Sequence, residues 1–449
     1  MPRWASRTVV AVLGVLLGFS VAAPVLAQIS DDLGVVGQLQ FTNAAGDKVF
    51  VAGVDLSIDD VGGATTDAEG NFRIPVPSPG EYTINIDVAT LPAGVSLRDP
   101  DRPSLQVKVS ENGDQRIIFP LVSGDATAST TTATTSEGNW SARRIGQLTL
   151  EGLKLGLYLA MAAIGLSLIY GTTGLVNFAH AELITWGALM AFFFNIYGLV
   201  GVFGFLSALP PPFGGGVNFV FATILATVLG GAFGYLLNRV VFRTARNNKV
   251  SLLAQMVMTI GLSIFVRYVF LYFFGGRYRT YGDYSAQRAN SFLGLELTTR
   301  DAIAMAVSIV ILVGVGVGLT RTRTGRAMRA VSDSKDLAES SGINVEKVIS
   351  QVWIFGASLA ALSGTFFGFD QVKWDIGTRI LLLVFAAVTL GGLGTAFGAL
   401  VGAIIVGIAI NLSTLVIDSE LKNLTALVVL ILALLLRPQG ILGKKQRIG

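Results

Sequence analysis

The carboxy-terminal two thirds of the chain consists of long apolar segments separated by short polar connections. One of them, 380–393, is shorter than the roughly 20 apolar residues that a membrane span needs. We expect it to be re-entrant or half of a broken helix, whose backbone must be covered by protein. The pattern predicts an all-α polytopic membrane protein with about 8–9 transmembrane segments. The nine apolar segments are 153–170, 175–197, 217–241, 251–274, 301–320, 349–369, 380–393, 395–417 and 422–436.

The region before these segments has a different pattern, in which apolar and polar residues alternate over short runs. Such alternation predicts half-buried strands. Gly, Pro, Asn and Asp, which turns favour, separate the runs. We therefore expect a small all-β sandwich over residues 28–122. The predicted strands are 35–41, 54–58, 71–76, 82–88, 105–109 and 116–119.

Two stretches of this region carry a resemblance. Residues 65–72, TTDAEGNF, and residues 79–82, PGEY, resemble the carboxypeptidase-regulatory-like or transthyretin-like sandwich modules. The resemblance implies a fold and not an activity.

The amino terminus has the features of an export signal. Two arginines precede an apolar run at 8–19, and a small-residue cleavage pattern follows at 25–27. We predict a signal peptide at 1–27; the alternative is an uncleaved first membrane helix. Residues 123–139 are rich in Ser, Thr, Ala and Gly and predict a flexible linker between the β domain and the membrane body.

Composition supports a membrane location. Hydrophobic residues make up 52% of the 449 residues and charged residues only 14%, which is too apolar for a soluble globular protein. The net charge of +4 comes from short basic clusters between apolar segments, so no single basic patch indicates nucleic-acid binding. The chain contains no cysteine, which excludes disulfides and thiol nucleophiles.

The basic clusters also predict the orientation of the chain. Alternation of the segments places 239–249, 321–347 and 437–447 on one side, and basic connections are typical of the cytoplasmic side. The connection 275–301 also contains four arginines, although the alternation places it outside. We expect a multi-pass protein of the bacterial cytoplasmic membrane with an extracytoplasmic amino-terminal domain.

Glycines are abundant within the apolar segments. Those at 394–402 recur every four residues and predict a helix face that another backbone can approach closely. Glycine-rich stretches at 171–174 and 391–394 occur in both halves of the body. They indicate an internal repeat with interrupted helices near a transport path, and Gly391, Gly392 and Gly394 are candidates for that path.

Several stretches, taken in order, resemble one family. They are 170–182, YGTTGLVNFAHAE; 325–330, GRAMRA, continued through 336–344; 390–395, LGGLGT; and 436–443, LRPQGILG. This set resembles the permeases of branched-chain amino acid ABC transporters, although the family usually has glycine where this chain has Ala181. Urea permeases share the pattern, so a urea or short-chain amide permease is the alternative.

The resemblance implies several partners. It implies a dimer of ATP-binding cassette subunits, a second permease subunit and an extracytoplasmic solute-binding protein. The sequence agrees, because it contains no Gly-x-x-x-x-Gly-Lys-Ser/Thr phosphate loop and the ATP must be hydrolysed elsewhere. No cofactor or metal is expected, and the chain is predicted not to be an enzyme.

The predicted cytoplasmic connection 325–348 is the candidate coupling element to the ATPase. It is the longest such connection and favours helix. Arg326 and Arg329 lie three residues apart, on one face. Ala338 and Gly342 lie four apart and would permit close docking. The alternative is an ordinary basic loop. The predicted coupling residues are Gly325, Arg326, Arg329, Ala338, Gly342 and Ile343.

Three polar residues interrupt the segment 175–197. On a regular helix Asn177 and His180 share a face, whereas Glu182 points about 160° away from His180. The three are candidates for a gate or translocation path, near the predicted cytoplasmic end, with interhelix hydrogen bonding and direct substrate contact as alternatives. Arg267 is expected to extend towards the outer interface.

Other function classes fit the sequence less well. An ion-coupled secondary carrier needs carboxylates deep in the membrane, and the segments contain few. A sensor would need a cytoplasmic signalling domain. A membrane hydrolase would need an acid–base pair, and the chain has a single histidine.

Overall fold

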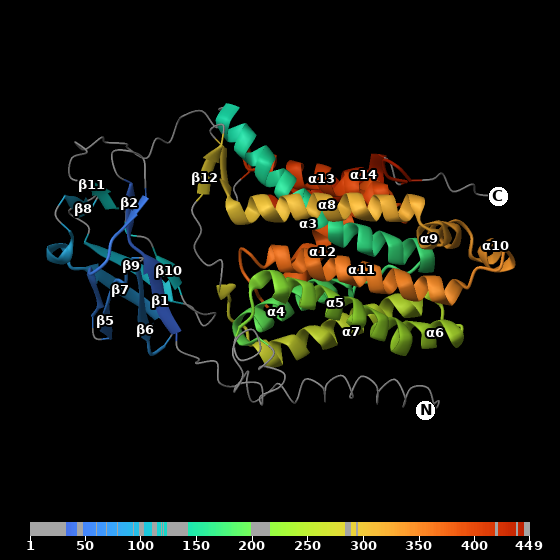
Figure 1. Ribbon diagram of the computed structural model, residues 1–449, viewed down its shortest axis with the longest axis horizontal. Coiled ribbons are helices and arrows are strands. Elements are labelled where there is room, and N and C mark those ends of the chain that lie inside the picture. Colours follow the sequence, from blue (N-terminus) through green and yellow to red (C-terminus); the bar gives the residue numbers. More distant parts are fainter. Residues whose placement is uncertain are drawn as a thin grey trace. The chain divides into compact units, whose positions relative to one another are not determined.

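The computed structural model forms two compact units, an amino-terminal β domain and a helical unit, drawn in Figure 1. The predicted signal peptide and nearly all of the predicted linker lie outside the described residues. The described residues are 33–42, 48–59, 61–68, 70–78, 80–92, 94–97, 103–109, 115–117, 119, 121–123, 142–198, 216–282, 289–292, 295–417, 421–436 and 439–443.

The β domain contains several sheets. The four-stranded sheet has the order β5-β4-β7-β9, with all neighbours antiparallel, and the three-stranded sheet has the order β10-β1-β6. The two remaining sheets pair β2 with β3 and β8 with β11. The strands are β1 (Leu33–Gln38), β2 (Gln40–Thr42), β3 (Lys48–Phe50), β4 (Asp55–Ile58), β5 (Gly62–Thr65), β6 (Asn71–Val76), β7 (Gly80–Ile86), β8 (Val95–Leu97), β9 (Ser104–Val109), β10 (Gln115–Ile117) and β11 (Leu121–Ser123).

The alternation seen in the sequence builds one core. Successive residues of a strand point to opposite faces, so β6 buries Phe72, Ile74 and Val76 and exposes the residues between them. These side chains join apolar residues of the other sheets in a single cluster. Each of the six predicted strands overlaps an observed strand, but 35–41 is divided between β1 and β2, which lie in different sheets. The missed strands β3, β5, β8 and β11 have only three or four residues each. The sandwich arrangement of the sheets stays a prediction.

Each of the nine apolar segments contains a helix, because a backbone in a bilayer must satisfy its hydrogen bonds internally. A hairpin of β12 (Ala289–Phe292) and β13 (Leu295–Thr298) precedes α8. The helices are α3 (Ala142–Thr173), α4 (His180–Tyr197), α5 (Phe219–Leu237), α6 (Arg243–Asn247), α7 (Leu252–Phe274), α8 (Thr299–Arg321), α9 (Arg323–Asp333), α10 (Lys335–Ser340), α11 (Val345–Phe367), α12 (Ile376–Gly391), α13 (Ala396–Ser413) and α14 (Lys422–Leu436), and the π-helical turn Asn238–Phe242 joins α5 to α6.

The expected count of 8–9 spans is not confirmed. Within the described residues six helices are long and apolar enough to cross a membrane: α3, α5 with its continuation to Asn247, α7, α8, α11 and α13. Helices α12 and α14 are apolar but shorter.

The helical unit has two distinct ends (Figure 1). One carries α9 and α10 and is called here the α9–α10 end. The other carries the β12–β13 hairpin, where Gln147, near the start of α3, donates to the carbonyl oxygen of Glu296 over 3.0 Å.

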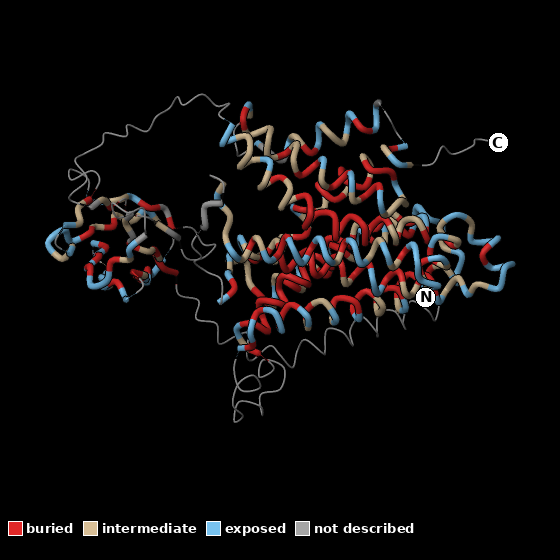
Figure 2. Tube along the Cα trace, turned by 45° about the horizontal axis from the view of Figure 1, so that its top comes forward, coloured by how far each residue is buried: buried red, intermediate tan, exposed pale blue. Residues whose placement is uncertain are grey.

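Close backbone packing holds the centre of this unit together. The centre is buried, whereas exposed positions lie along the outer helices and at the α9–α10 end (Figure 2). Gly398 and Gly402 of α13 face the backbone of Gly391 and Ala387 in α12 so closely that a Cβ at either glycine would meet it. The predicted small-residue packing face is therefore confirmed for Gly398 and Gly402, whereas Gly394 lies before the start of α13 and contacts Gly171 instead.

Candidate functional site

Helix α4 begins inside the helical unit and not at one of its ends. Nε2 of His180, its first residue, lies 3.0 Å from the carbonyl oxygen of Ala162 in α3. Ala162 precedes Thr173, the last residue of α3, by eleven residues, which is about 16 Å along a helix. Residues 174–179 therefore return through a depth equal to about half of a bilayer's hydrocarbon core.

This geometry corrects two expectations. The segment 175–197 is not one regular helix, because Asn177 precedes the start of α4. Asn177, His180 and Glu182 also do not lie near an end of the unit, and all three side chains are fully buried. The predicted divergence of His180 and Glu182 is confirmed, since His180 faces α3 whereas Glu182 faces α7.

Glu182 belongs to a group that we call the buried polar cluster, formed with Ser263, Arg267 and Thr378. Its Oε1 accepts a hydrogen bond of 2.8 Å from Ser263 Oγ and lies 3.4 Å from Nε of Arg267. The hydroxyl of Thr378, at the start of α12, lies beside the same carboxylate. Glu182 Oε2 is buried, and the contact between the Thr378 hydroxyl and the carboxylate is too poor in geometry to count as a hydrogen bond.

Arg267 differs from the prediction. It pairs with Glu182 instead of extending to an interface, and its Nη2 donates to Ser263 Oγ over 3.2 Å. Its side chain is 24% exposed. Sequence reasoning did not single out Ser263, although it lies four residues before Arg267 and therefore on the same face of α7.

Helix α12 also begins inside the unit, next to α4. The amide of Gly377 donates to Thr185 Oγ1 over 3.0 Å, and a Cβ at Gly377 would meet the carbonyl of Ala181. The amides at both helix starts are satisfied, by local turns or by Thr185. These amides are therefore not open to a ligand. The positive ends of the α4 and α12 dipoles nevertheless both point at the same buried region.

The glycine-rich stretches lie elsewhere, where helices meet near the α9–α10 end. Gly171 and Gly394 contact each other, so the structure brings the two stretches together. Gly392 has a φ of +114°, which only glycine adopts readily, and packs on residues 439–443. Gly391 accepts a hydrogen bond of 2.9 Å from the Leu442 amide. These contacts are close packing, and a path role for these glycines stays a prediction.

The candidate coupling residues lie on α9 and α10. Gly325 packs directly on the backbone of α8, at Gly318 and Leu319. The guanidinium groups of Arg326 and Arg329 donate to carbonyl oxygens at the end of α8, over 3.1 and 3.2 Å. Both arginines are otherwise exposed on one face.

The end of α10 is a tight turn. The Ile343 amide donates to the Ala338 carbonyl over 3.0 Å, and Gly342 between them has a φ of +82°. Ala338 is buried, so the four-residue spacing does not place it on an exposed docking face with Gly342. Leu337 is 70% exposed instead, an apolar side chain that sequence reasoning missed.

Charged side chains attach this connection to the helices around it. Arg246 makes two hydrogen bonds of 3.1 Å to the carboxylate of Glu346, at the start of α11. Lys335 Nζ donates to the carbonyl oxygen of Thr173 over 3.1 Å. Partial burial, together with the positive charge of Arg246, lowers the pKa of Lys335 below its usual value.

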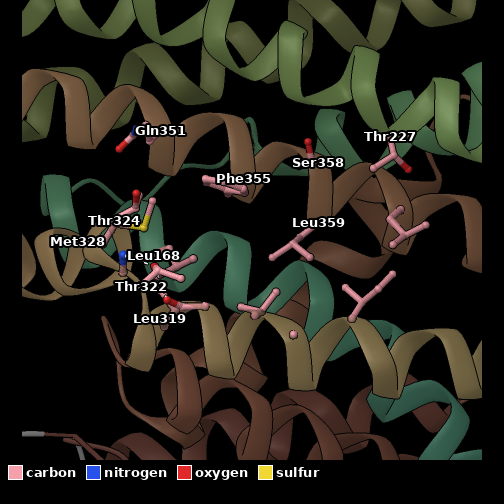
Figure 3. Close-up of a pocket in the computed structure, with 16 residues that line it drawn as sticks. Leu168, Thr227, Leu319, Thr322, Thr324, Met328, Gln351, Phe355, Ser358 and Leu359 are labelled. Atoms are coloured by element: carbon pink, nitrogen blue, oxygen red, sulfur yellow. Dashed lines mark hydrogen bonds between the residues drawn. The ribbon is translucent and has the colours of Figure 1, made fainter.

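Away from the buried polar cluster, a groove runs between α5, α8 and α11. It comprises two adjoining cavities of about 600 and 350 Å³ that share Thr227, Ile311 and Leu362. Figure 3 shows the larger one, where mainly apolar side chains of α8 and α11 face each other. Arg300 is the only charged residue that lines either cavity. Such a surface suits hydrocarbon better than a charged solute. Within the described residues no group of three or more His, Asp or Glu side chains is placed to hold a metal ion.

Comparison with known proteins places the helical unit among permeases. Residues 148–434 match the family described as "Branched-chain amino acid transport system / permease component". The chain is 30% identical over 307 residues to the high-affinity branched-chain amino acid transport system permease protein LivH of Escherichia coli K12. The aligned region covers 67% of this chain and 96% of LivH. The chain is 28% identical over 308 residues to the corresponding protein BraD of Pseudomonas aeruginosa, with the same coverage. The matched residues include the buried polar cluster and α9–α10 but not the β domain.

Proposed function

Because this chain belongs to the branched-chain amino acid transport permease family, we propose that it is the membrane permease of an importer that moves branched-chain amino acids across the bacterial cytoplasmic membrane. The observation that carries the proposal is the family match over nearly the whole helical unit. The apolar helices of that unit support it, since six of them can span a bilayer.

Energy for uptake comes from ATP hydrolysis on separate subunits. The chain has no phosphate-binding loop of its own, and a phosphate loop needs both its glycine-rich backbone and its lysine. The expected assembly contains two ATPase subunits, a second permease and a soluble binding protein that delivers the substrate. The amino-terminal β domain lies outside the cell membrane.

The α9–α10 end faces the cytoplasm and contacts the ATPase. The basic residues of 321–347 support this orientation, because basic connections are retained in the cytoplasm. Exposed Leu337 would enter an apolar pocket of the ATPase, while Gly325, Arg326, Arg329 and Gly342 fix the position of α9 and α10. Movement of the ATPase would then be transmitted to α8 and α11.

The translocation path passes the starts of α4 and α12. Helices interrupted at the middle of a membrane are typical of transporter binding regions. Asn177 and Glu182 support this role, since both are fully buried and keep polar atoms without partners among the described residues. His180 would hold α4 against α3 and act in gating.

Uptake into proteoliposomes tests the substrate. The chain would be reconstituted with its ATPase, second permease and binding protein, and uptake of labelled leucine and of labelled urea compared. We expect ATP-dependent accumulation of leucine and none of urea. Accumulation of urea without leucine would overturn the proposed substrate.

A further inference from the structure

We propose that the buried polar cluster is a binding site for a zwitterionic α-amino acid, in which Glu182 receives the α-ammonium group and Arg267 the α-carboxylate. The inference rests on the proposed function and adds a site to it. It begins from an incompletely satisfied charge pair at the junction of two interrupted helices.

Glu182 has the properties of an ammonium acceptor. Its carboxylate is fully buried, and Oε2 accepts no hydrogen bond within the described part of the chain. A buried carboxylate oxygen without a donor is costly. An ammonium group carries three donors and would satisfy this oxygen with charge-assisted hydrogen bonds, which the neighbouring Thr378 hydroxyl, a single neutral donor in poor geometry, does not supply.

Arg267 has the complementary properties. Its contact to Glu182 is long, 3.4 Å, and its one other hydrogen bond among the described residues goes to Ser263. A guanidinium has five donors in a planar fork that matches a carboxylate. Much of that capacity is therefore open to a ligand, and the starts of α4 and α12 direct positive dipole ends towards the same region.

Ligand binding would exchange one charge pair for two. In this conformation Arg267 covers Glu182, and each group serves as the other's only counter-ion among the described residues. An amino acid between them would give each group its own partner and keep the net charge at zero. Such an exchange avoids leaving a charge unpaired inside the membrane.

The neighbouring surface suits an aliphatic side chain. Tyr268, next to Arg267, lies 6.1 Å from the ring of Trp374, which precedes α12. Arg267 is partly exposed, as are its α7 neighbours Ile264 and Tyr268. Urea can hydrogen-bond these groups but has no formal charge to pair with either of them, so the site favours an amino acid.

Equilibrium binding to the complete permease–ATPase complex, purified without the binding protein, tests the site. Labelled leucine would be displaced by three competitors: leucine, leucinamide, which lacks the carboxylate, and 4-methylpentanoate, which lacks the ammonium group. We expect saturable binding of leucine. Both analogues should bind with at least about tenfold lower affinity than leucine, which corresponds to about 1.4 kcal/mol. Absence of saturable binding, or an analogue that competes as well as leucine, would overturn the proposal. This arm needs only the wild-type protein.

Variants assign the roles of the two residues. Glu182→Gln should weaken leucine binding by about tenfold without weakening the binding of 4-methylpentanoate, because 4-methylpentanoate no longer leaves a charged Glu182 unpaired. Arg267→Gln should likewise weaken leucine binding without weakening the binding of leucinamide. Asp301→Asn is the matched control, because Asp301 pairs with Lys154 away from the cluster. If each variant lowered the affinity for all three ligands equally, Glu182 and Arg267 would have only a structural role.

The outcome separates this inference from the proposed function. If the wild-type complex imports leucine but the variants bind leucine normally, the site is wrong and the permease assignment stands. If the wild-type complex does not import leucine, the proposed function itself fails.

Discussion

At the scale of single residues, Lys335 shows how one side chain connects the α9–α10 end to the membrane helices. Its ammonium group donates to the Thr173 carbonyl at the end of α3. Partial burial and the nearby Arg246 lower its pKa, although Asp336 and Glu346 act in the opposite direction. The folded chain therefore binds a proton at this site less readily than the unfolded chain does.

Lys335→Met should change how stability depends on pH. The folded state binds fewer protons than the unfolded state between its own lowered pKa and 10.5. Wild-type stability should therefore rise, relative to the variant, as pH increases through that window. Thermal midpoints of the detergent-solubilised protein at a series of pH values measure this. Parallel curves for the two proteins would contradict it.

The sequence identified part of the site at this scale. Asn177, His180 and Glu182 stand out because polar groups in an apolar segment are rare. Their partners were not predictable, because Ser263 and Arg267 lie more than 80 residues away in the chain and only tertiary packing brings them to Glu182. Arg267 was expected at the interface because it lies near the end of its apolar segment and its partner Glu182 could not be foreseen.

At the scale of elements, the interrupted helices explain where prediction failed. The residues before α4 and α12, Ala179 and Asp375, make no side-chain capping hydrogen bond. The caps of α5, α7, α8, α9, α10 and α11 do, through Asn218, Ser251, Thr298, Thr322, Ser334 and Asn344. Capping residues are the main sequence signal for a helix start. Without one, the apolar segment 175–197 looks continuous, whereas the nine helical segments themselves follow directly from hydropathy.

Gly342→Ala tests the turn that ends α10. At a φ of +82° a Cβ costs about 1–2 kcal/mol, although no other atom lies near Gly342. We expect α10 to shift and leucine uptake to fall several-fold while ATPase activity persists. Gly314→Ala is the control, since Gly314 lies in α8 with open space around it. Unchanged uptake per ATP in Gly342→Ala would remove this turn from the coupling element.

At the scale of the whole molecule, the account requires the β domain and the α9–α10 end to lie on opposite sides of the membrane. The chain has no natural cysteine, so single introduced cysteines report position without background. Ser57 in the β domain and Glu339 on α10 are both exposed. In intact spheroplasts an impermeant maleimide should label Ser57→Cys, and should label Glu339→Cys only after permeabilisation. Labelling of Glu339→Cys in intact cells would invert the topology.

The central claim is that the helical unit is a conduit whose energy comes from a separate ATPase. The most direct measurement is leucine accumulation in proteoliposomes prepared with and without the ATPase subunits, with ATP or an imposed ion gradient as the energy source. The account predicts uphill accumulation only with the ATPase, ATP and binding protein present together. Uphill accumulation by the permease alone, driven by the ion gradient, would contradict it.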